Sequence, residues 1–316
     1  GARAPLQRQR SSPTGISRSA AAPAGRSRPE QPEARLPGQQ RHASSAAAPS
    51  DPVDAQRFDD AGVPRQAHGV GFEDEVDAED GRSHGCVDNS GRTLLMHAAG
   101  EGDLDAMRRL LAKGADINAA DECSCTALMY AATYGHIGAV NCLLEQGATV
   151  EAKSQDGWTS LITAAYNGHR EAVRCLLERG ADIEAADERG WTSLMHVAFN
   201  GDNETLRCLL DFRAQVDTTD ADGRDALVYA AFNGHLDNAK CLLDRSSVRQ
   251  RDGQKTDSAR DTAVLFAAIR GHCSVLQLLL QAYPATPETR NAAQKLAMDH
   301  GHGGVVDFLV KAAAAA

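Results

Sequence analysis

A period of 33 residues runs through the chain from about residue 88 onward. One glycine and one pair of leucines recur at this interval in five successive units. The glycines are Gly102, Gly135, Gly168, Gly201 and Gly234, and the leucine pairs are Leu110-Leu111, Leu143-Leu144, Leu176-Leu177, Leu209-Leu210 and Leu242-Leu243. Self-similarity at a fixed interval of roughly 20–50 residues is typical of stacked repeats, so the period predicts a repeat solenoid rather than one globular core.

One unit, Ser154–Ala186, shows how each period folds. Gln155-Asp156-Gly157 has turn chemistry, and Thr159 stands where a helix N-cap belongs, just before an apolar run. Gly168 and Gly180 each follow a short amphipathic stretch, so they predict the ends of two short helices. Because two helices of about two turns each bury too little apolar surface alone, each unit must stack on its neighbours.

Four units contain a Thr-x-Leu-x box directly after the turn. The four boxes are Thr93-Leu-Leu-Met, Thr126-Ala-Leu-Met, Thr159-Ser-Leu-Ile and Thr192-Ser-Leu-Met. They resemble the Thr-Pro-Leu-His box of the ankyrin-repeat family, without its Pro and His, and the Gly-His and Gly-Ala-Asp signals of that family recur in several units. The resemblance runs from about Asp88 to the end of the chain. It implies an all-α solenoid of helix-turn-helix units with β-turn tips, but it implies little about which partner the array binds.

Composition divides the chain into three parts. Residues 1–50 carry eight arginines against Glu30 and Glu33, a local charge of +6, and contain almost no large apolar residue. Such a segment is predicted to be disordered, but its Arg-rich and Ser-rich composition also resembles an organelle transit peptide, so a flexible tail and a targeting segment are both open alternatives. Residues 51–87 form an acidic linker, and residues 88–316 form the repeat domain.

The repeat domain is predicted to hold six repeats and a worn C-terminal cap. The bounds are Asp88–Ala120, Asp121–Lys153, Ser154–Ala186, Asp187–Thr219, Asp220 to about Arg251, about Asp252–Arg290, and Asn291–Ala316 for the cap. Repeat five lacks one residue, because Ser246-Ser247-Val248 replaces the Gly-Ala-Asp-Ile of other units, and repeat six has an insertion around residues 253–260. We expect irregular stacking and greater mobility over residues 246–262. Arg213 replaces the glycine of repeats one to three, which predicts a left-handed residue at a cost of about 1 kcal/mol.

Motifs of common catalytic and nucleotide sites are missing from the repeats. The sequence contains no Gly-x-x-x-x-Gly-Lys-Ser/Thr, no His-Glu-x-x-His and no set of protein-kinase motifs. We therefore predict that the protein is not an enzyme and that it binds no cofactor and no metal.

Two residue types that can bind metals also recur at the repeat positions. The histidines are His136, His169, His235, His272 and His302, and the cysteines are Cys142, Cys175, Cys208 and Cys241. The imidazoles are predicted to make turn and inter-repeat hydrogen bonds, and the thiols to be small core side chains on helices about 10 Å apart, too far for disulfides. Reduced thiols favour an intracellular setting, either the cytoplasm or an organelle matrix.

Charge and hydropathy limit the classes of partner. Residues 51–316 carry a charge of −16, because the whole chain carries −10 and the first fifty residues carry +6. An acidic body of this kind argues against nucleic-acid binding. The chain contains no run of about 18 apolar residues, so no membrane span is expected.

In ankyrin arrays the turn tips and the exposed side of the first helix line a concave face, and by position the resemblance selects eleven partner-binding candidates. They are Trp158, Trp191, Tyr134, Tyr166, Asn167, Phe199, Asn200, Phe232, Asn233, Arg224 and Arg189. Both tryptophans of the chain occupy one repeat position, with columns of rings and amides beside them, although only 4% of all residues are aromatic. Large rings beside amides are typical of interface hot spots, but packing between adjacent repeats is the alternative explanation.

The turn tips hold Asp156, Glu188 and Asp222 against Arg189, which favours an apolar or mildly basic partner segment. We predict a non-catalytic protein–protein interaction module that acts as an adaptor or as a structural subunit of a larger assembly. Two alternatives stay open. One is a regulatory subunit of an enzyme complex, and the other is an organelle targeting or chaperone-like factor that binds apolar client segments.

Overall fold

The computed structural model describes residues 87–249, 257–283 and 285–314. The tail predicted over residues 1–50 and the acidic linker, apart from Val87, lie outside these residues. Within the described ranges the chain forms fourteen helices and no β-strand, which confirms the predicted all-α repeat architecture.

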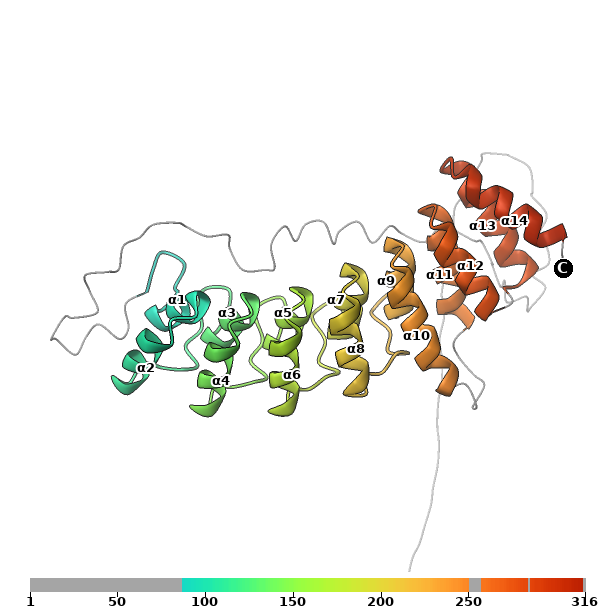
Figure 1. The fold of residues 1–316 in the computed structure, drawn as a ribbon. Helices are drawn as coiled ribbons and strands as arrows, with labels where there is room; N and C mark the ends of the chain where they lie inside the picture. The colour runs from blue at the N-terminus through green and yellow to red at the C-terminus, as the bar shows by residue number, and fades with distance from the viewer. Residues whose placement is uncertain (1–86, 250–256, 284, 315–316) are drawn as a thin grey trace, which may run out of the picture. The chain divides into compact units, whose positions relative to one another are not determined.

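The helices follow one another as seven pairs of a first and a second helix (Figure 1). The first helices are α1 Leu94–Glu101, α3 Ala127–Thr133, α5 Ser160–Tyr166, α7 Ser193–Asn200, α9 Ala226–Asn233, α11 Asp257–Ile269 and α13 Pro287–Asp299. The second helices are α2 Leu104–Ala112, α4 Ile137–Glu145, α6 Arg170–Glu178, α8 Asn203–Asp211, α10 Leu236–Arg249, α12 Cys273–Ala282 and α14 Gly303–Ala314.

Each pair packs against the pair before it and the pair after it. First helices contact first helices from α1 to α13, and second helices contact second helices from α2 to α14. The apolar positions of the period fill the space between them, and Leu161, Ala165, Val173 and Leu176 are each at most 1% exposed. Two short helices are stable here because each repeat buries its apolar face against its neighbours.

Threonine hydroxyls and glycines mark the helix ends. The Thr93 hydroxyl accepts the N–H of Met96 and the Thr159 hydroxyl accepts the N–H of Ile162, both at 3.3 Å, so the predicted N-cap at Thr159 is confirmed. Gly168, just after α5, has a φ of +73°, a left-handed conformation that ends the helix at little steric cost.

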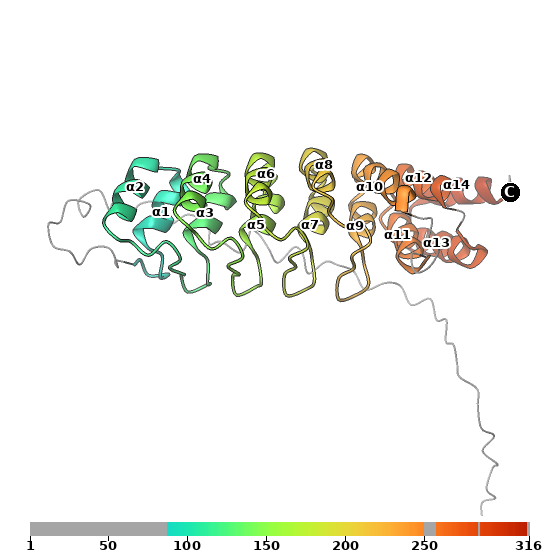
Figure 2. The ribbon, with the colours of Figure 1, turned by 90° about the horizontal axis from the view of Figure 1, so that it is seen from below.

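The loops between successive pairs extend past the first helices on the side away from the second helices, as Figure 2 shows, and their ends are the turn tips. Single backbone hydrogen bonds join each tip to the next. The N–H groups of Glu122, Gln155, Glu188 and Ala221 donate to the carbonyl oxygens of Ser90, Cys123, Asp156 and Arg189, at 3.2, 2.9, 3.1 and 3.2 Å respectively. At Gly157 a Cβ atom would lie 2.9 Å from the backbone nitrogen of Glu188, so glycine allows this close approach. The tips are therefore held in register along the array.

Repeats five and six break the regular pattern, as the sequence predicts. Helix α10 continues to Arg249, because Ser246-Ser247-Val248 supplies no glycine to end it. Helix α11 begins at Asp257 and is 13 residues long, whereas the earlier first helices have seven or eight residues. The mobility predicted over residues 246–262 falls partly on residues 250–256, which lie outside the described residues.

Two non-glycine residues of the described ranges have a positive φ. Arg213, at +70°, confirms the left-handed conformation predicted for the position that is Gly180 in repeat three. Ser124, at +62°, replaces the turn glycine of the other tips. Both residues adopt a left-handed backbone conformation that glycine adopts more easily.

No helix of the described ranges is long and apolar enough to cross a membrane. The seven cysteines in these ranges are free thiols. Of the four that recur before the leucine pairs, Cys175 is buried, and Cys142, Cys208 and Cys241 are half-buried.

Candidate functional site

The two tryptophans lie between repeats. Trp158 is 6% exposed, and its ring centroid lies 5.1 Å from that of Tyr166 and 4.9 Å from that of His196 in the next repeat. Trp191 is 7% exposed and lies 4.0 Å from the ring of Tyr229, also in the next repeat. Both rings pack between adjacent repeats, which was the alternative to an interface role, and little of either ring is accessible to a partner.

Two further candidates are buried at the junction of repeats five and six. Phe232 packs 5.4 Å from Phe266, and the guanidinium of Arg270 covers the Phe232 ring at 4.5 Å. Arg224 is 7% exposed and forms an ion pair with Asp222 at 3.2 Å. The Arg224 guanidinium also lies 5.7 Å from the centroid of the Phe266 ring. The ring and cation contacts stabilise the stacking of the two repeats, whereas the ion pair lies within repeat five.

Tyr134 is the most exposed ring among the candidates, with 39% of its surface accessible. It lies over Gly100 of repeat one, where a Cβ atom would be 3.4 Å from the Tyr134 ring. Tyr166 and Phe199, at the neighbouring position in later repeats, are half-buried. Tyr134 is thus a ring that a partner can cover without unfolding the array.

The asparagine column joins neighbouring repeats. The side-chain amides of Asn200 and Asn233 donate to the carbonyl oxygens of Tyr166 and Phe199, both at 2.7 Å. Asn167 instead donates to a carbonyl within its own helix. Asn200 is exposed, so its side chain both links repeats and lies on the surface.

The histidine row makes the inter-repeat hydrogen bonds that the sequence predicts. The Nε2 atoms of His136, His169, His235, His272 and His302 donate to the carbonyl oxygens of Gly100, Thr133, Phe199, Phe232 and Ile269, at 2.9, 2.9, 2.9, 3.0 and 2.7 Å. Each imidazole also lies against the glycine of the preceding repeat, and a Cβ atom at Gly135 would be 2.5 Å from His169 Nδ1. Burial lowers the pKa of His272, which favours its neutral form.

Aspartates at the first position of four repeats were not among the sequence-predicted sites. One carboxylate oxygen of each bonds to the side chain nine residues later, in the pairs Asp88–His97, Asp121–Tyr130, Asp187–His196 and Asp220–Tyr229. The other oxygen accepts two backbone N–H groups of the same tip. Their recurrence at the repeat interval is the signal that could have identified them, and their role is to shape the turn tips.

Two of these pairs shift the pKa of a tyrosine. Burial, and then the neighbouring carboxylate, raises the pKa of Tyr130 and of Tyr229 above the usual value, so both phenols stay protonated and donate to their aspartates. At Asp88 burial acts to raise the pKa, but the N–H groups of Arg92 and Ser90 outweigh it and lower the pKa overall. Asp88 therefore acts as a charged acceptor.

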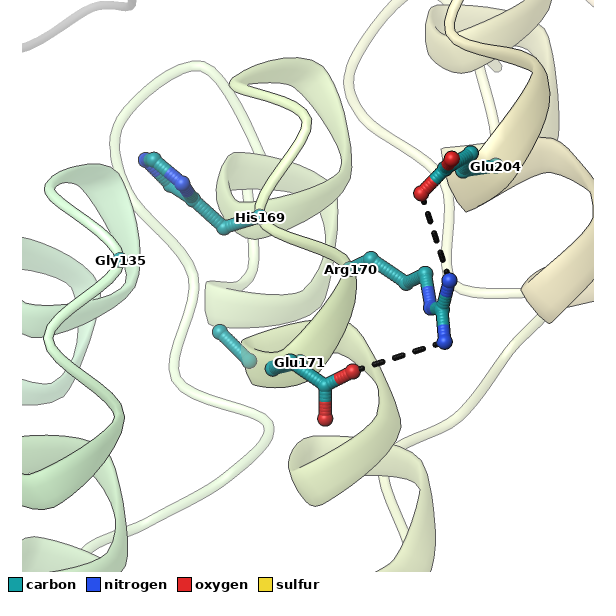
Figure 3. Close-up of a pocket in the computed structure, with 6 residues that line it drawn as sticks. Gly135, His169, Arg170, Glu171 and Glu204 are labelled. Atoms are coloured by element: carbon teal, nitrogen blue, oxygen red, sulfur yellow. Dashed lines mark hydrogen bonds and ion pairs between the residues drawn. The ribbon is translucent and has the colours of Figure 1, made fainter.

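A surface cavity of about 360 Å³ lies beside the start of α6 (Figure 3). Arg170 crosses it and contacts Glu204 at 3.3 Å and Glu171 at 3.6 Å, so its charge is already balanced by two carboxylates. His169, at the same edge, is engaged with the preceding repeat. The described residues contain no group of three or more His, Cys, Asp or Glu side chains placed to hold a metal ion.

The sequence contains one catalytic-type motif outside the repeats. Gly81-Arg-Ser-His-Gly85 matches Gly-x-Ser-x-Gly, but it precedes the first repeat and lies outside the described residues. In hydrolases this motif requires a strand before it and a helix after it to expose the serine. The match alone therefore assigns no activity.

A comparison with protein families matches the model described as ankyrin repeats in three copies, over residues 95–187 and 182–252. Together the two segments cover half of the chain. The chain belongs to the ankyrin-repeat family. A comparison with curated proteins found no match. Ankyrin repeats are protein–protein interaction modules, and the matched residues reach from α1 to beyond the end of α10.

In this ankyrin array the eleven candidates separate by accessibility. Four are buried, namely Trp158, Trp191, Arg224 and Phe232. Four are half-buried, namely Tyr166, Asn167, Phe199 and Asn233. Tyr134, Arg189 and Asn200 are exposed, so their side chains are the most accessible to a partner among the candidates.

Proposed function

We propose that this ankyrin-repeat protein is a non-catalytic adaptor or structural subunit that binds a partner protein through its tip face. The tip face is defined as the exposed side chains of the turn tips and first-helix ends, namely Tyr134, Arg189, Asn200, Glu122, Asp156 and Glu188. The observation that carries the proposal is that the charged groups of this face stand on tips joined one to the next by backbone hydrogen bonds, whereas Tyr134 and Asn200 stand at the ends of α3 and α7. A surface already held in its binding geometry loses little conformational entropy on association.

The buried rings support this surface from below. Trp191 links repeats four and five by its contact with Tyr229, and Trp158 links repeats three and four by its contact with His196. In this proposal the tryptophans stiffen the array, and the exposed ring of Tyr134 supplies the apolar contact. In this proposal Tyr134, which a partner can reach, takes the anchoring role that the sequence suggested for the tryptophans.

The chemistry of the tip face favours a protein partner with apolar and mildly basic character. Three of its six residues are carboxylates and one is an arginine. Nucleic-acid phosphates would be repelled by this surface, whereas lysine and arginine side chains would be attracted.

Affinity capture with the full chain tests the proposal, with Tyr134→Ala/Asn200→Ala as the test variant. Phe212→Ala is the matched control, because Phe212 is 38% exposed, close to the 39% of Tyr134, but follows a second helix. Equal helical circular dichroism should first show that all three proteins are folded. Loss of specific partners from the double variant alone supports the tip face, and an unchanged set of partners in both variants refutes it.

A further inference from the structure

Acidic residues of the second helices are neutralised within the array. Within the described ranges seven ion pairs involve them, namely Asp105–Arg108, Glu145–Arg179, Glu171–Arg170, Glu171–Arg174, Glu178–Arg174, Glu204–Arg170 and Asp211–Arg245, at 3.6, 3.6, 3.6, 2.6, 4.0, 3.3 and 2.6 Å. The side of the array formed by α2 to α10 therefore carries much of its negative charge beside a compensating arginine.

The turn tips differ. Glu122, Asp156 and Glu188 are exposed on three successive tips, and none of them forms an ion pair with another residue of the described ranges. On the next tip, which belongs to repeat five, Asp222 is paired with Arg224, and Arg224 is itself buried. Three exposed carboxylates thus stand on successive tips, one per repeat, with Glu122 and Glu188 at the first tip position and Asp156 at the second. The exposed Arg189 lies on the same tip as Glu188.

The tip face also contains accessible apolar surface at the ends of the first helices. Tyr134, at the end of the first helix of repeat two, is 39% exposed, and the half-buried rings of Tyr166 and Phe199 follow in repeats three and four. Exposed carboxylates on successive tips, on a face that also exposes ring surface, complement a segment that carries both cationic and apolar side chains.

We infer that the partner segment binds in an extended conformation along the tips, with a lysine or arginine at every third residue. The inference rests on the proposed function and adds the partner's chemistry and spacing. Helices packed side by side are about 8–10 Å apart, so successive tips are separated by about this distance. An extended chain rises about 3.3 Å per residue, so three residues span one repeat.

A helical partner would need a different spacing. Since an α-helix rises about 1.5 Å per residue, cationic residues about seven positions apart would meet successive tips. The two modes can therefore be distinguished by peptides that differ in the spacing of their lysines.

The test measures binding of labelled peptides to the full chain by fluorescence anisotropy at low ionic strength. The first probe is Lys-Ser-Leu repeated four times, the second has the same composition with all lysines adjacent, and the third places lysines seven residues apart in an alanine-rich helix. The first probe should bind about fivefold or more tighter than either other probe, and its affinity should fall as salt rises. Equal or tighter binding of the clustered or the helical probe overturns the inference.

Two charge-matched variants locate the site. Glu122→Gln/Asp156→Asn/Glu188→Gln should weaken binding of the first probe by about tenfold, because three weak exposed pairs are lost together. Asp105→Asn/Glu145→Gln/Glu178→Gln removes the same charge from the second helices and should leave binding unchanged. Equal weakening by both variants would show attraction to net charge alone, which also overturns the inference.

The inference can fail while the proposed function holds. If captured partners are lost from Tyr134→Ala/Asn200→Ala but retained by the triple tip variant, the tip face binds a partner without recognising basic residues of that partner. If neither variant loses partners, the proposed function itself is wrong.

Discussion

Replacing Trp191 by alanine should destabilise the middle of the array. The indole is 7% exposed and packs against rings on both sides, with His196 at 5.1 Å and Phe199 at 5.6 Å in its own repeat and Tyr229 at 4.0 Å in the next. Truncation leaves a cavity between repeats four and five, because neighbours on two stacked helix pairs cannot both move into the space.

The expected magnitude follows from the area that the ring buries. A buried tryptophan removes about 150–250 Å² from water, which at about 25 cal/mol per Å² corresponds to roughly 4–6 kcal/mol. Measured truncations of buried aromatic residues cost about 3–5 kcal/mol, so we expect a loss of about 4 kcal/mol. This is a large part of the roughly 5–15 kcal/mol that stabilises a typical domain.

Urea unfolding followed by far-ultraviolet circular dichroism measures the effect. In a repeat array, weaker coupling between two neighbours should also broaden or split the transition, since stability is the sum of repeat and interface contributions. Trp191→Phe retains a ring and should lose only about 1–2 kcal/mol. A Trp191→Ala protein with unchanged stability that no longer captures partners would refute the packing interpretation and return Trp191 to the interface.

Three further variants should have raised stability, each measured by urea unfolding. Burial raises the pKa of Asp225 to about 6 from an ordinary 3.8, so the folded state holds the proton more tightly and the free energy of unfolding falls as pH rises from about 4 to about 6. Asp225→Thr replaces the carboxylate that accepts the N–H of Val228 with a hydroxyl that can accept it, so it should remove this pH dependence and add about 1–2 kcal/mol at pH 7. An unchanged pH profile would contradict the assignment. The hydroxyls of Ser160 and Ser193 are fully buried without a hydrogen-bond partner, so Ser160→Ala/Ser193→Ala should stabilise the protein by about 1 kcal/mol, and a loss of stability would show that the hydroxyls are satisfied. Arg213→Gly should add about 0.5–1 kcal/mol by relieving a φ of +70°, whereas Arg213→Ala, which keeps the strain, should not.

The local structure of this protein follows from short-range chemistry that is visible in the sequence. A turn glycine, a threonine before an apolar run and a glycine after it determine where a helix begins and ends within a few residues. The predicted cap at Thr159 and the left-handed Arg213 are confirmed because each depends on neighbours one helical turn away. The extension of α10 likewise follows from the missing glycine after its leucine pair.

The accessibility of the candidate site could not be predicted in this way. Trp158 and Trp191 are separated by one period, and nothing in their own repeats shows whether the ring faces solvent. Their burial depends on His196 and Tyr229, side chains of the following repeat that lie over the rings. Both explanations of the ring column were therefore consistent with the sequence.

The neutralisation of charge on the surface also depends on contacts between repeats. Composition alone determines that the body is acidic, and the repeat period determines which carboxylates lie on tips and which lie on second helices. Whether each carboxylate is neutralised depends on arginines one repeat away, such as Arg170 beside Glu204 and Arg179 beside Glu145. Tertiary structure decides this, because ion pairs form over a few ångströms between side chains that are more than thirty residues apart in the chain.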